Sequence, residues 1–167
     1  MPVPELKGED MIEEKYQIVA DFAVSAVEGI RRTGMKVLAL RDRYAKIMMP
    51  LEGNINHIGT MYAGSLFILG EFSGGILHGV SFDYNKFFPI VREVTIRFQR
   101  AAKTNVTLEV ALSREMAAKI QDTAEREGKC DFGLKLDLKD ADDQTVAEVE
   151  GIWQLRKFRA GQSIAGT

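Results

Sequence analysis

The spacing of hydrophobic residues first follows a helical period. Between residues 10 and 34, apolar side chains recur every three or four positions, which places them on one face of a helix: Ile12, Tyr16, Val19, Ala23, Ala26, Val27 and Ile30. Asp10 and Glu13 match a capping box with aspartate in place of serine or threonine, and Gly34 is a typical helix end. Residues 35–41 and 44–50 are short apolar stretches that predict two strands, joined by a turn at residues 42–43.

The next segment, residues 60–77, is apolar on every side. It is long enough for a helix, and a helix of this kind is normally buried all round. Glu71 is the only formal charge between Gly53 and Phe82. Each glycine in the segment costs about 1 kcal/mol of helix propensity relative to alanine. We therefore expect the glycines to let other backbone approach closely: Gly64, Gly70, Gly74 and Gly75.

After Pro89 the pattern changes to alternation of apolar and polar residues, which is typical of strands that bury one face. Four such strands are predicted, at residues 94–99, 106–113, 132–139 and 147–156. A short polar helix, residues 115–127, is predicted between the second and third of them and ends at Gly128. An antiparallel sheet with one all-apolar helix predicts an α+β fold in which the sheet curls around the helix.

Composition narrows the classes of function. The 167 residues are enough for one domain with a sizeable core. The net charge of −2 argues against a dedicated nucleic-acid binder. The single cysteine, Cys130, excludes a disulfide within the chain and favours a cytoplasmic location. The first ten residues show no signal peptide, and Glu71 with its neighbouring glycines argues against a membrane span.

Glu71 is the first candidate for chemistry, because burying an unpaired carboxylate is costly and shifts its pKa. The alternative is that Glu71 lies on a stripe of the helix that reaches solvent or an interface. Asn56, His57, Gly59 and Thr60 stand at the start of the same helix, where free N–H groups suit an anion or an oxyanion. Plain helix capping by Asn and Thr explains them as well.

The two histidines do not predict a dyad with Glu71 inside one chain. His78 lies seven residues after Glu71, which is about 10.5 Å along a helix. His57 is fourteen residues before it. With two histidines and no HExxH spacing, neither a metal site nor a cofactor is predicted.

Residues 56–64, Asn-His-Ile-Gly-Thr-Met-Tyr-Ala-Gly, resemble the N-x-x-G-x-x-H-G-G signature of hotdog-fold acyl-CoA thioesterases of the phenylacetate-pathway type. In that family the signature precedes a central helix wrapped by an antiparallel sheet, and the catalytic carboxylate follows the Asn by fifteen residues. Here that position is Glu71. Tyr62 replaces the signature His, and Ala63 replaces the Gly that follows it. The sequence also resembles a related branch of thioesterases that is less characterised.

The resemblance implies a hotdog domain with residues 1–34 as an N-terminal arm and helix, residues 35–157 as the core and residues 158–167 as a tail. It implies hydrolysis of an acyl-CoA at a dimer-interface site, in a homodimer or a homotetramer. The implied catalytic residues are Glu71 as base or nucleophile, Asn56 as positioner and the N–H of Ala63 as oxyanion donor. The substrate-binding candidates are Gly59, Thr60, Tyr62, Gly64, Arg97 and Arg100, the arginines for the phosphates of the coenzyme.

Other readings of these residues remain open. Met61, Leu66, Phe67, Phe72, Phe87 and Phe88 are candidates to line an acyl tunnel, and core packing explains each of them too. Arg97, Arg100 and Lys103 are also consistent with a solvated strand end. A non-catalytic hotdog module that binds acyl chains or oligomerises is favoured by the changes at Tyr62 and Ala63. A hotdog dehydratase or hydratase ranks last, because Tyr62 removes the expected His.

Overall fold

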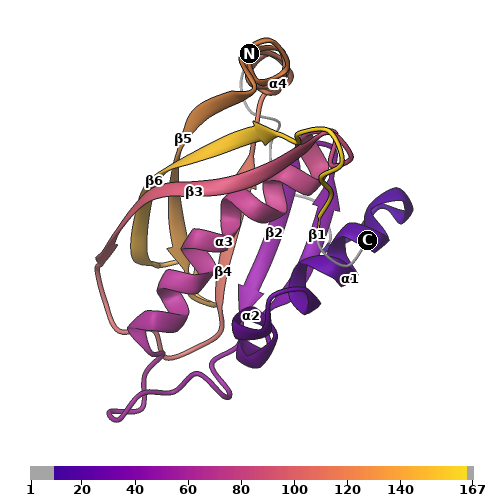
Figure 1. Cartoon of the computed structure of the whole chain (residues 1–167). Coiled ribbons are helices and arrows are strands. Elements are labelled where there is room, and N and C mark those ends of the chain that lie inside the picture. The colour runs from indigo at the N-terminus through magenta and orange to yellow at the C-terminus, as the bar shows by residue number, and fades with distance from the viewer. Residues whose placement is uncertain (1–9, 165–167) are drawn as a thin grey trace.

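The computed structural model describes residues 10–164 and places them in one six-stranded sheet with four α-helices (Figure 1). A short 3₁₀ turn, Glu14–Tyr16, precedes the first helix. The helices are α1 Gln17–Ser25, α2 Glu28–Thr33, α3 Ala63–Ser81 and α4 Arg114–Glu127. The strands are β1 Lys36–Arg41, β2 Tyr44–Met49, β3 Phe87–Phe98, β4 Val106–Ala111, β5 Lys129–Lys139 and β6 Thr145–Lys157.

The sheet is antiparallel throughout, in the order β1-β2-β4-β5-β6-β3, and it wraps around α3 (Figure 1). This is the hotdog arrangement and confirms the predicted α+β fold. The sheet begins and ends with β1 and β3, so β3 bonds to β6 on one side only, among the strands that the structure describes. The core forms where the inner face of the sheet meets α3, with Leu69, Ile76 and Leu77 buried on the helix.

Two of the glycines in α3 let the sheet approach the helix closely, as expected in part. A Cβ added to Gly70 would lie 2.6 Å from a methyl carbon of Val149, and one added to Gly74 would lie 2.1 Å from the Trp153 ring. Cβ contacts this short are essentially never seen, so alanine at either position would force the neighbouring side chain of β6 or the helix to shift. The prediction was wrong about the partner, because side chains of β6 fill the space and not backbone.

The N-terminal helix is interrupted where one helix was predicted. Between α1 and α2, Val27 takes an extended conformation and stays 53% exposed. Gly34 ends α2 in the left-handed conformation, as predicted. The capping box was wrong, because Asp10 accepts a hydrogen bond from Lys46 instead, and Glu13 makes no side-chain cap. Asp10 is therefore paired with Lys46 of β2 and does not cap the helix.

The central helix also meets the length and composition of a membrane span. It is the one such helix within residues 10–164, and 56% of its most apolar window is buried inside the fold. The core helix of a globular domain has these same properties, because its neighbours are as apolar as lipid.

Candidate active site

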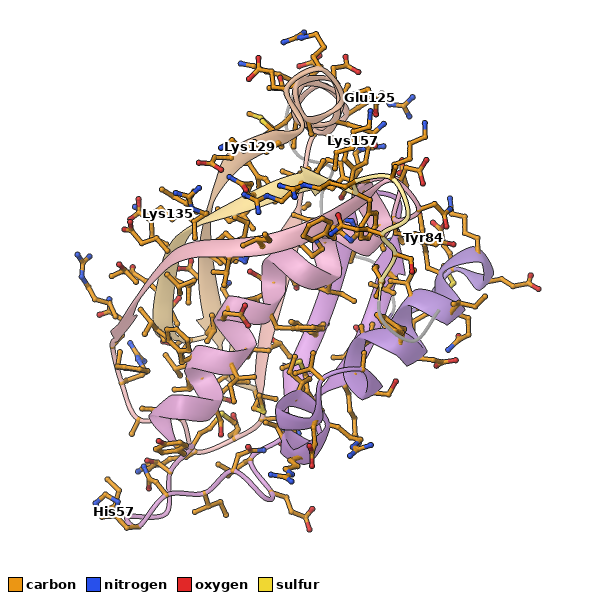
Figure 2. The ribbon with its side chains drawn as sticks, viewed as in Figure 1. His57, Tyr84, Glu125, Lys129, Lys135 and Lys157 are labelled. Carbon is orange, nitrogen blue, oxygen red and sulfur yellow. The ribbon has the colours of Figure 1, made fainter. Side chains whose placement is uncertain are left out.

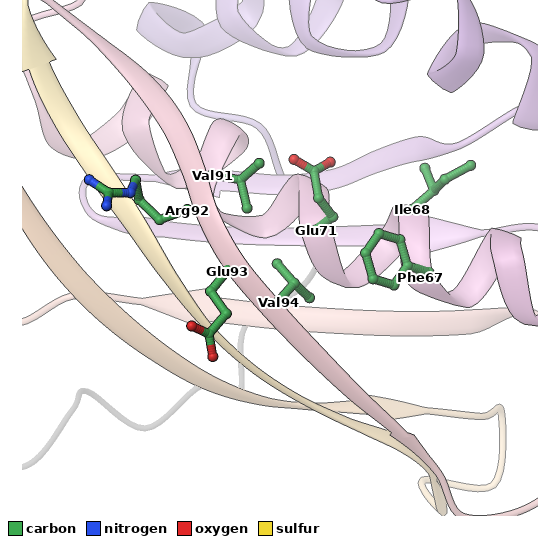
Figure 3. A pocket seen from close by; sticks show the side chains of 7 residues that line it. All are labelled: Phe67, Ile68, Glu71, Val91, Arg92, Glu93 and Val94. Atoms are coloured by element: carbon green, nitrogen blue, oxygen red, sulfur yellow. The ribbon is translucent and has the colours of Figure 1, made fainter.

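Glu71 lies midway along α3, where the helix faces the edge strand β3. Its side chain is half-buried, and burial raises the pKa of its carboxyl above 4.5. It lines a pocket of about 360 Å³ with Phe67, Ile68 and four consecutive residues of β3, Val91 to Val94 (Figure 3). The acid is therefore less acidic than an exposed glutamate and is open to a small space, which suits a general base.

A β-bulge in β3 shapes this pocket. Val91 pairs with Trp153 and Glu93 pairs with Ile152, so Arg92 has no partner in the ladder. Figure 3 shows Val91 and Val94 on the α3 side of β3, whereas Arg92 and Glu93 extend to the other side. Bulges often bend an edge strand beside an active site. The bulged residues line the pocket together with Glu71. The bulge was not predicted from the sequence.

Trp153 fixes the backbone of α3 at this point. Its Nε1–H donates a hydrogen bond of 3.1 Å to the carbonyl oxygen of Glu71. The ring is almost fully buried and occupies the space above Gly74. A buried tryptophan N–H normally finds a partner, and here the partner is the backbone of the candidate catalytic residue.

The N-terminus of α3 offers free donors. Within the described residues, no acceptor contacts the backbone N–H groups of Ala63 and Gly64, whereas those of Ser65 and Leu66 bond to the carbonyl oxygen of Tyr62. Free N–H groups at the positive end of a helix dipole bind anions and developing oxyanions. The ring of Tyr62 folds back over Gly64, where a Cβ would lie 2.2 Å from it.

The signature loop is held by Asn56. Its Oδ1 accepts hydrogen bonds from the N–H groups of Ile58 and Thr60, and its Nδ2 donates to the Thr60 hydroxyl at 2.9 Å. Gly59 stands in the left-handed conformation at φ 83°, which the turn requires. Within one chain, the contacts of Asn56 and Thr60 are therefore those of a loop organiser.

Asn54, which was not among the residues predicted from the sequence, attaches this loop to the core. Asn54 is buried, and its Nδ2 donates to the carbonyl oxygens of Thr33 and Pro50. Its Oδ1 accepts from the Ser65 hydroxyl in the first turns of α3 at 2.8 Å. A polar residue between two turn signals gives no sign in the sequence of such distant partners.

A single chain does not bring the candidate groups together. Ala63 and Glu71 are eight residues apart in one straight helix, a rise of about 12 Å. Arg100 lies near the signature loop, because the Met61 N–H donates to the carbonyl oxygen of Ala102, two residues after Arg100. The side chain of Arg100 donates a hydrogen bond to Gln144. Arg97 faces outward from β3, with Glu148 as its cross-strand neighbour.

The two histidines lie in other parts of the structure. His57 is exposed at the tip of the loop, away from the sheet (Figure 2). His78 is buried and bonds through Nε2 to the Phe87 carbonyl oxygen, which ties the end of α3 to the start of β3. Burial lowers the pKa of His78 to about 4, so it is neutral near neutral pH. Among residues 10–164, no three Cys, His, Asp or Glu side chains cluster as for a metal ion.

A second, larger cavity of about 960 Å³ opens on the other side of Glu71. Its walls come from α1, α2, α3, the start of β3 and residues 158–164. Of the expected tunnel residues, Phe72 and Phe88 line this cavity and Phe67 lines the smaller pocket. Met61, Leu66 and Phe87 belong to the buried core, which agrees with the alternative interpretation of core packing for these three.

The chain is similar to a protein whose crystal structure is known. A crystal structure from Pseudomonas aeruginosa, of a protein of unknown function described as a probable thioesterase, is 36% identical, with a TM-score of 0.81. The match covers 89% of this chain and 99% of that one. No curated protein gave a match.

More distant structures share the fold. A thioesterase from Staphylococcus aureus is 19% identical over 78% of this chain and 99% of that one, with a TM-score of 0.62. A thioesterase from Haemophilus influenzae is 10% identical over 86% and 92%, with a TM-score of 0.66. Residues 18–155 match the family model described as a domain of unknown function, DUF4442. The chain therefore belongs to the DUF4442 family and has the hotdog fold of these thioesterases.

Proposed function

We propose that this protein hydrolyses the thioester of an acyl-CoA to a free acid and CoA. One observation carries the proposal: α3 presents free N–H groups at its start and, farther along, a half-buried carboxylate with a raised pKa. Oxyanion donors and a base are the groups that acyl transfer to water needs. The 36% identical relative described as a probable thioesterase supports the same class of reaction.

The chemistry assigns a task to each group. The N–H of Ala63 stabilises the negative charge that develops on the thioester oxygen. Glu71 takes a proton from water as the water oxygen attacks the carbonyl carbon. The tetrahedral intermediate then expels the CoA thiolate, which receives that proton from Glu71. The alternative is direct attack by the Glu71 carboxylate, which forms an acyl anhydride and expels the CoA thiolate. If water then attacks the Glu71 carbonyl carbon, the bridging oxygen from Glu71 leaves with the product, and a single turnover in labelled water detects this exchange.

We further propose that each site is shared between two copies of the chain. The rise of about 12 Å between Ala63 and Glu71 prevents both from acting on one carbonyl in the same chain. The free side of β3 is able to pair with its counterpart in a second copy. Since α3 runs antiparallel to β3, a two-fold pair would carry the start of one α3 toward Glu71 of the other. Exposed apolar side chains near this edge, Tyr62, Phe67, Val91 and Phe98, would be covered.

A distant relative supports the spacing of these residues. The Staphylococcus aureus thioesterase has been crystallised with a glutamine replaced by alanine and, separately, with a glutamate replaced by alanine. Those two positions are fifteen residues apart, as Asn56 and Glu71 are here. We propose that Asn56, with Gly59 and Thr60, positions the substrate across the interface, and that Arg97 and Arg100 contact the phosphates of the coenzyme.

The test is thiol release from acyl-CoAs by the wild type, by Glu71→Gln and by Ala63→Pro. Proline removes the N–H of Ala63 and is favoured at the first position of a helix, and Tyr62 already has the extended conformation that a following proline prefers. We expect each variant to lose activity about a hundredfold or more with an unchanged fold. Equal turnover by all three proteins would refute the assignment.

Mixing the two variants tests whether the site is shared. A heterodimer of Glu71→Gln and Ala63→Pro contains one site with both groups intact, if the groups come from different copies. The purified heterodimer should then recover up to about half of the wild-type activity by this symmetry argument. No recovery in a purified heterodimer would show that each chain acts alone.

A binding module without catalysis is the second candidate. The ring of Tyr62 over Gly64, and the full use of the Asn56 side chain inside its own loop, favour it. Acyl-CoA binding with no thiol release would establish this alternative.

A further inference from the structure

On one side, the large cavity beside Glu71 is lined by a stripe of α3 that contains two glycines and Glu71. Glu71, Gly75 and Gly79 recur every four residues and so form one stripe along α3. All three line the cavity, which begins at the carboxylate and follows the helix toward its end. From Glu71 to Gly79 the stripe rises about 12 Å.

Gly75 has no packing reason to be glycine. A Cβ added there would meet only the Phe72 ring, at 3.7 Å, which is an ordinary contact. Alanine in its place would favour the helix by about 0.5–1 kcal/mol. Gly70 and Gly74, by contrast, are filled by side chains of β6. The missing side chain at Gly75 leaves open space in the cavity, next to the candidate catalytic residue.

The walls of the cavity are mostly apolar, and they come from the N-terminal helices, the start of β3 and residues 158–164. Ile18 and Phe22 of α1, and Val27 between α1 and α2, line it and remain exposed. Phe88 and Phe158 stack at 4.8 Å between ring centres on the opposite side. Figure 2 shows Tyr84, another lining residue, near the end of α3 that is farther from the signature loop. An exposed apolar groove of this size is typical of a binding site for an apolar ligand.

We infer that this groove binds the acyl chain of the substrate and that the protein prefers medium-length and long chains. The inference rests on the proposed thioester hydrolysis, because it places the thioester carbonyl at Glu71. From there a straight acyl chain extends over Gly75 toward Gly79. Val19 of α1 packs against Gly79, because a Cβ added to Gly79 would lie 2.5 Å from a methyl carbon of Val19. The N-terminal helices thus form a wall of the chain-binding groove.

The test compares the wild type with Gly75→Leu on butyryl-, octanoyl-, dodecanoyl- and hexadecanoyl-CoA. Leucine would fill the groove and suits a helix. The matched control is Gly29→Leu, at a helical glycine of α2 that has no atom within 4 Å and does not line the groove. Val27→Glu, which adds a charge to the wall formed by the N-terminal helices, is a second variant that leaves α3 unchanged.

We expect kcat/KM of the wild type to rise with chain length. Gly75→Leu and Val27→Glu should reduce it tenfold or more for dodecanoyl-CoA, on the scale of the 1.4 kcal/mol that a tenfold change represents, and little for butyryl-CoA. Turnover without chain-length preference in the wild type, or equal loss on all substrates, would overturn the groove assignment while the hydrolase proposal stands.

If the wild type hydrolyses none of these substrates, the proposed function fails. Binding of a fatty acid then tests whether the groove is a site for an acyl chain. Dodecanoate that binds the wild type but not Gly75→Leu in calorimetry would still support the groove. Absence of binding would overturn it. Dodecanoate affinity that falls as the protein concentration rises would also overturn it, by showing that a second copy of the chain occupies the groove.

Discussion

Trp153 on β6 donates its indole hydrogen to the backbone carbonyl oxygen of Glu71, 3.1 Å away. The same ring occupies the space that a side chain at Gly74 would need. One buried residue therefore sets both the height and the rotation of α3 at the candidate catalytic carboxylate.

Trp153→Phe should show what this bond contributes. The variant removes the N–H and some ring volume, so we expect unfolding in urea to become easier by about 1–2 kcal/mol. We also expect kcat to fall more than KM changes, because Glu71 loses its fixed position. Tyr16→Phe, at a partly buried aromatic residue that lines neither pocket, is the control. A stable variant with wild-type kcat would contradict the positioning role.

Two adjacent glycines should respond in opposite ways to alanine. Gly74→Ala places a Cβ 2.1 Å from the Trp153 ring, and we expect a loss of about 1–3 kcal/mol in stability from overpacking. Gly75→Ala meets only an ordinary contact, and we expect a gain of about 0.5–1 kcal/mol. Urea unfolding of the pair measures the difference directly. Equal effects would mean that helix propensity, and not the contact with β6, sets the glycine at residue 74.

The raised pKa of Glu71 predicts how activity depends on pH. As a base, Glu71 must be ionised, so kcat/KM should rise with pH along a limb centred above 4.5, the ordinary value for glutamate. Burial is the cause, because it disfavours the charged form. A rate profile for the wild type that is flat from pH 5 to 8, with the limb at or below the ordinary value, would contradict this expectation.

Stability should depend on the same group with a definite sign. A carboxyl whose pKa is raised on folding holds its proton more tightly in the native state, so its contribution is greatest at low pH. That contribution is lost as the pH rises from the ordinary glutamate value through the raised one. Glu71→Gln should therefore be more stable than the wild type at neutral pH, and the gain should shrink toward pH 4. Thermal unfolding at several pH values measures it.

Asn54→Ala should destabilise the base of α3. The change leaves the Ser65 hydroxyl and the carbonyl oxygens of Thr33 and Pro50 without their partner. We expect a loss of about 1–3 kcal/mol, typical of buried polar groups left unsatisfied. Asn85→Ala, at an exposed residue, is the matched control. If both variants unfold at the same urea concentration, Asn54 is not the anchor described above.

The sequence predicted the elements whose signals are local. The apolar run around Glu71 predicted α3, although the helix begins at Ala63 and ends at Ser81, a few residues later than expected. Alternation predicted β4, β5 and β6, and the polar helix α4 ends at Gly128 as expected. The hotdog fold followed from the signature and was confirmed by the relatives.

Features that depend on distant partners were not accessible from the pattern. Asp10 looked like a cap, and its ion pair with Lys46 crosses 36 residues. The break at Val27 leaves an apolar spacing that still fits a continuous helix. The start of β3 is a run of five apolar residues, 87–91, in which no alternation is visible, so the bulge at Arg92 was hidden. The only sign of the bulge in the sequence is that the residues of β3 facing α3 change from odd to even residue numbers.

Because of that bulge, the shape of the site depends on the number of residues in β3. Before Arg92 the residues that face α3 have odd numbers, and after it they have even numbers. Deleting Arg92 alone would restore regular alternation and leave every other pairing with β6 intact, and it would remove one of the residues that line the pocket with Glu71. Gly151 accommodates the irregular strand, since a Cβ there would lie 2.7 Å from the Glu93 carbonyl oxygen. This sheet therefore has a position at which gaining or losing one residue would reshape the pocket beside Glu71 without altering the order of the strands.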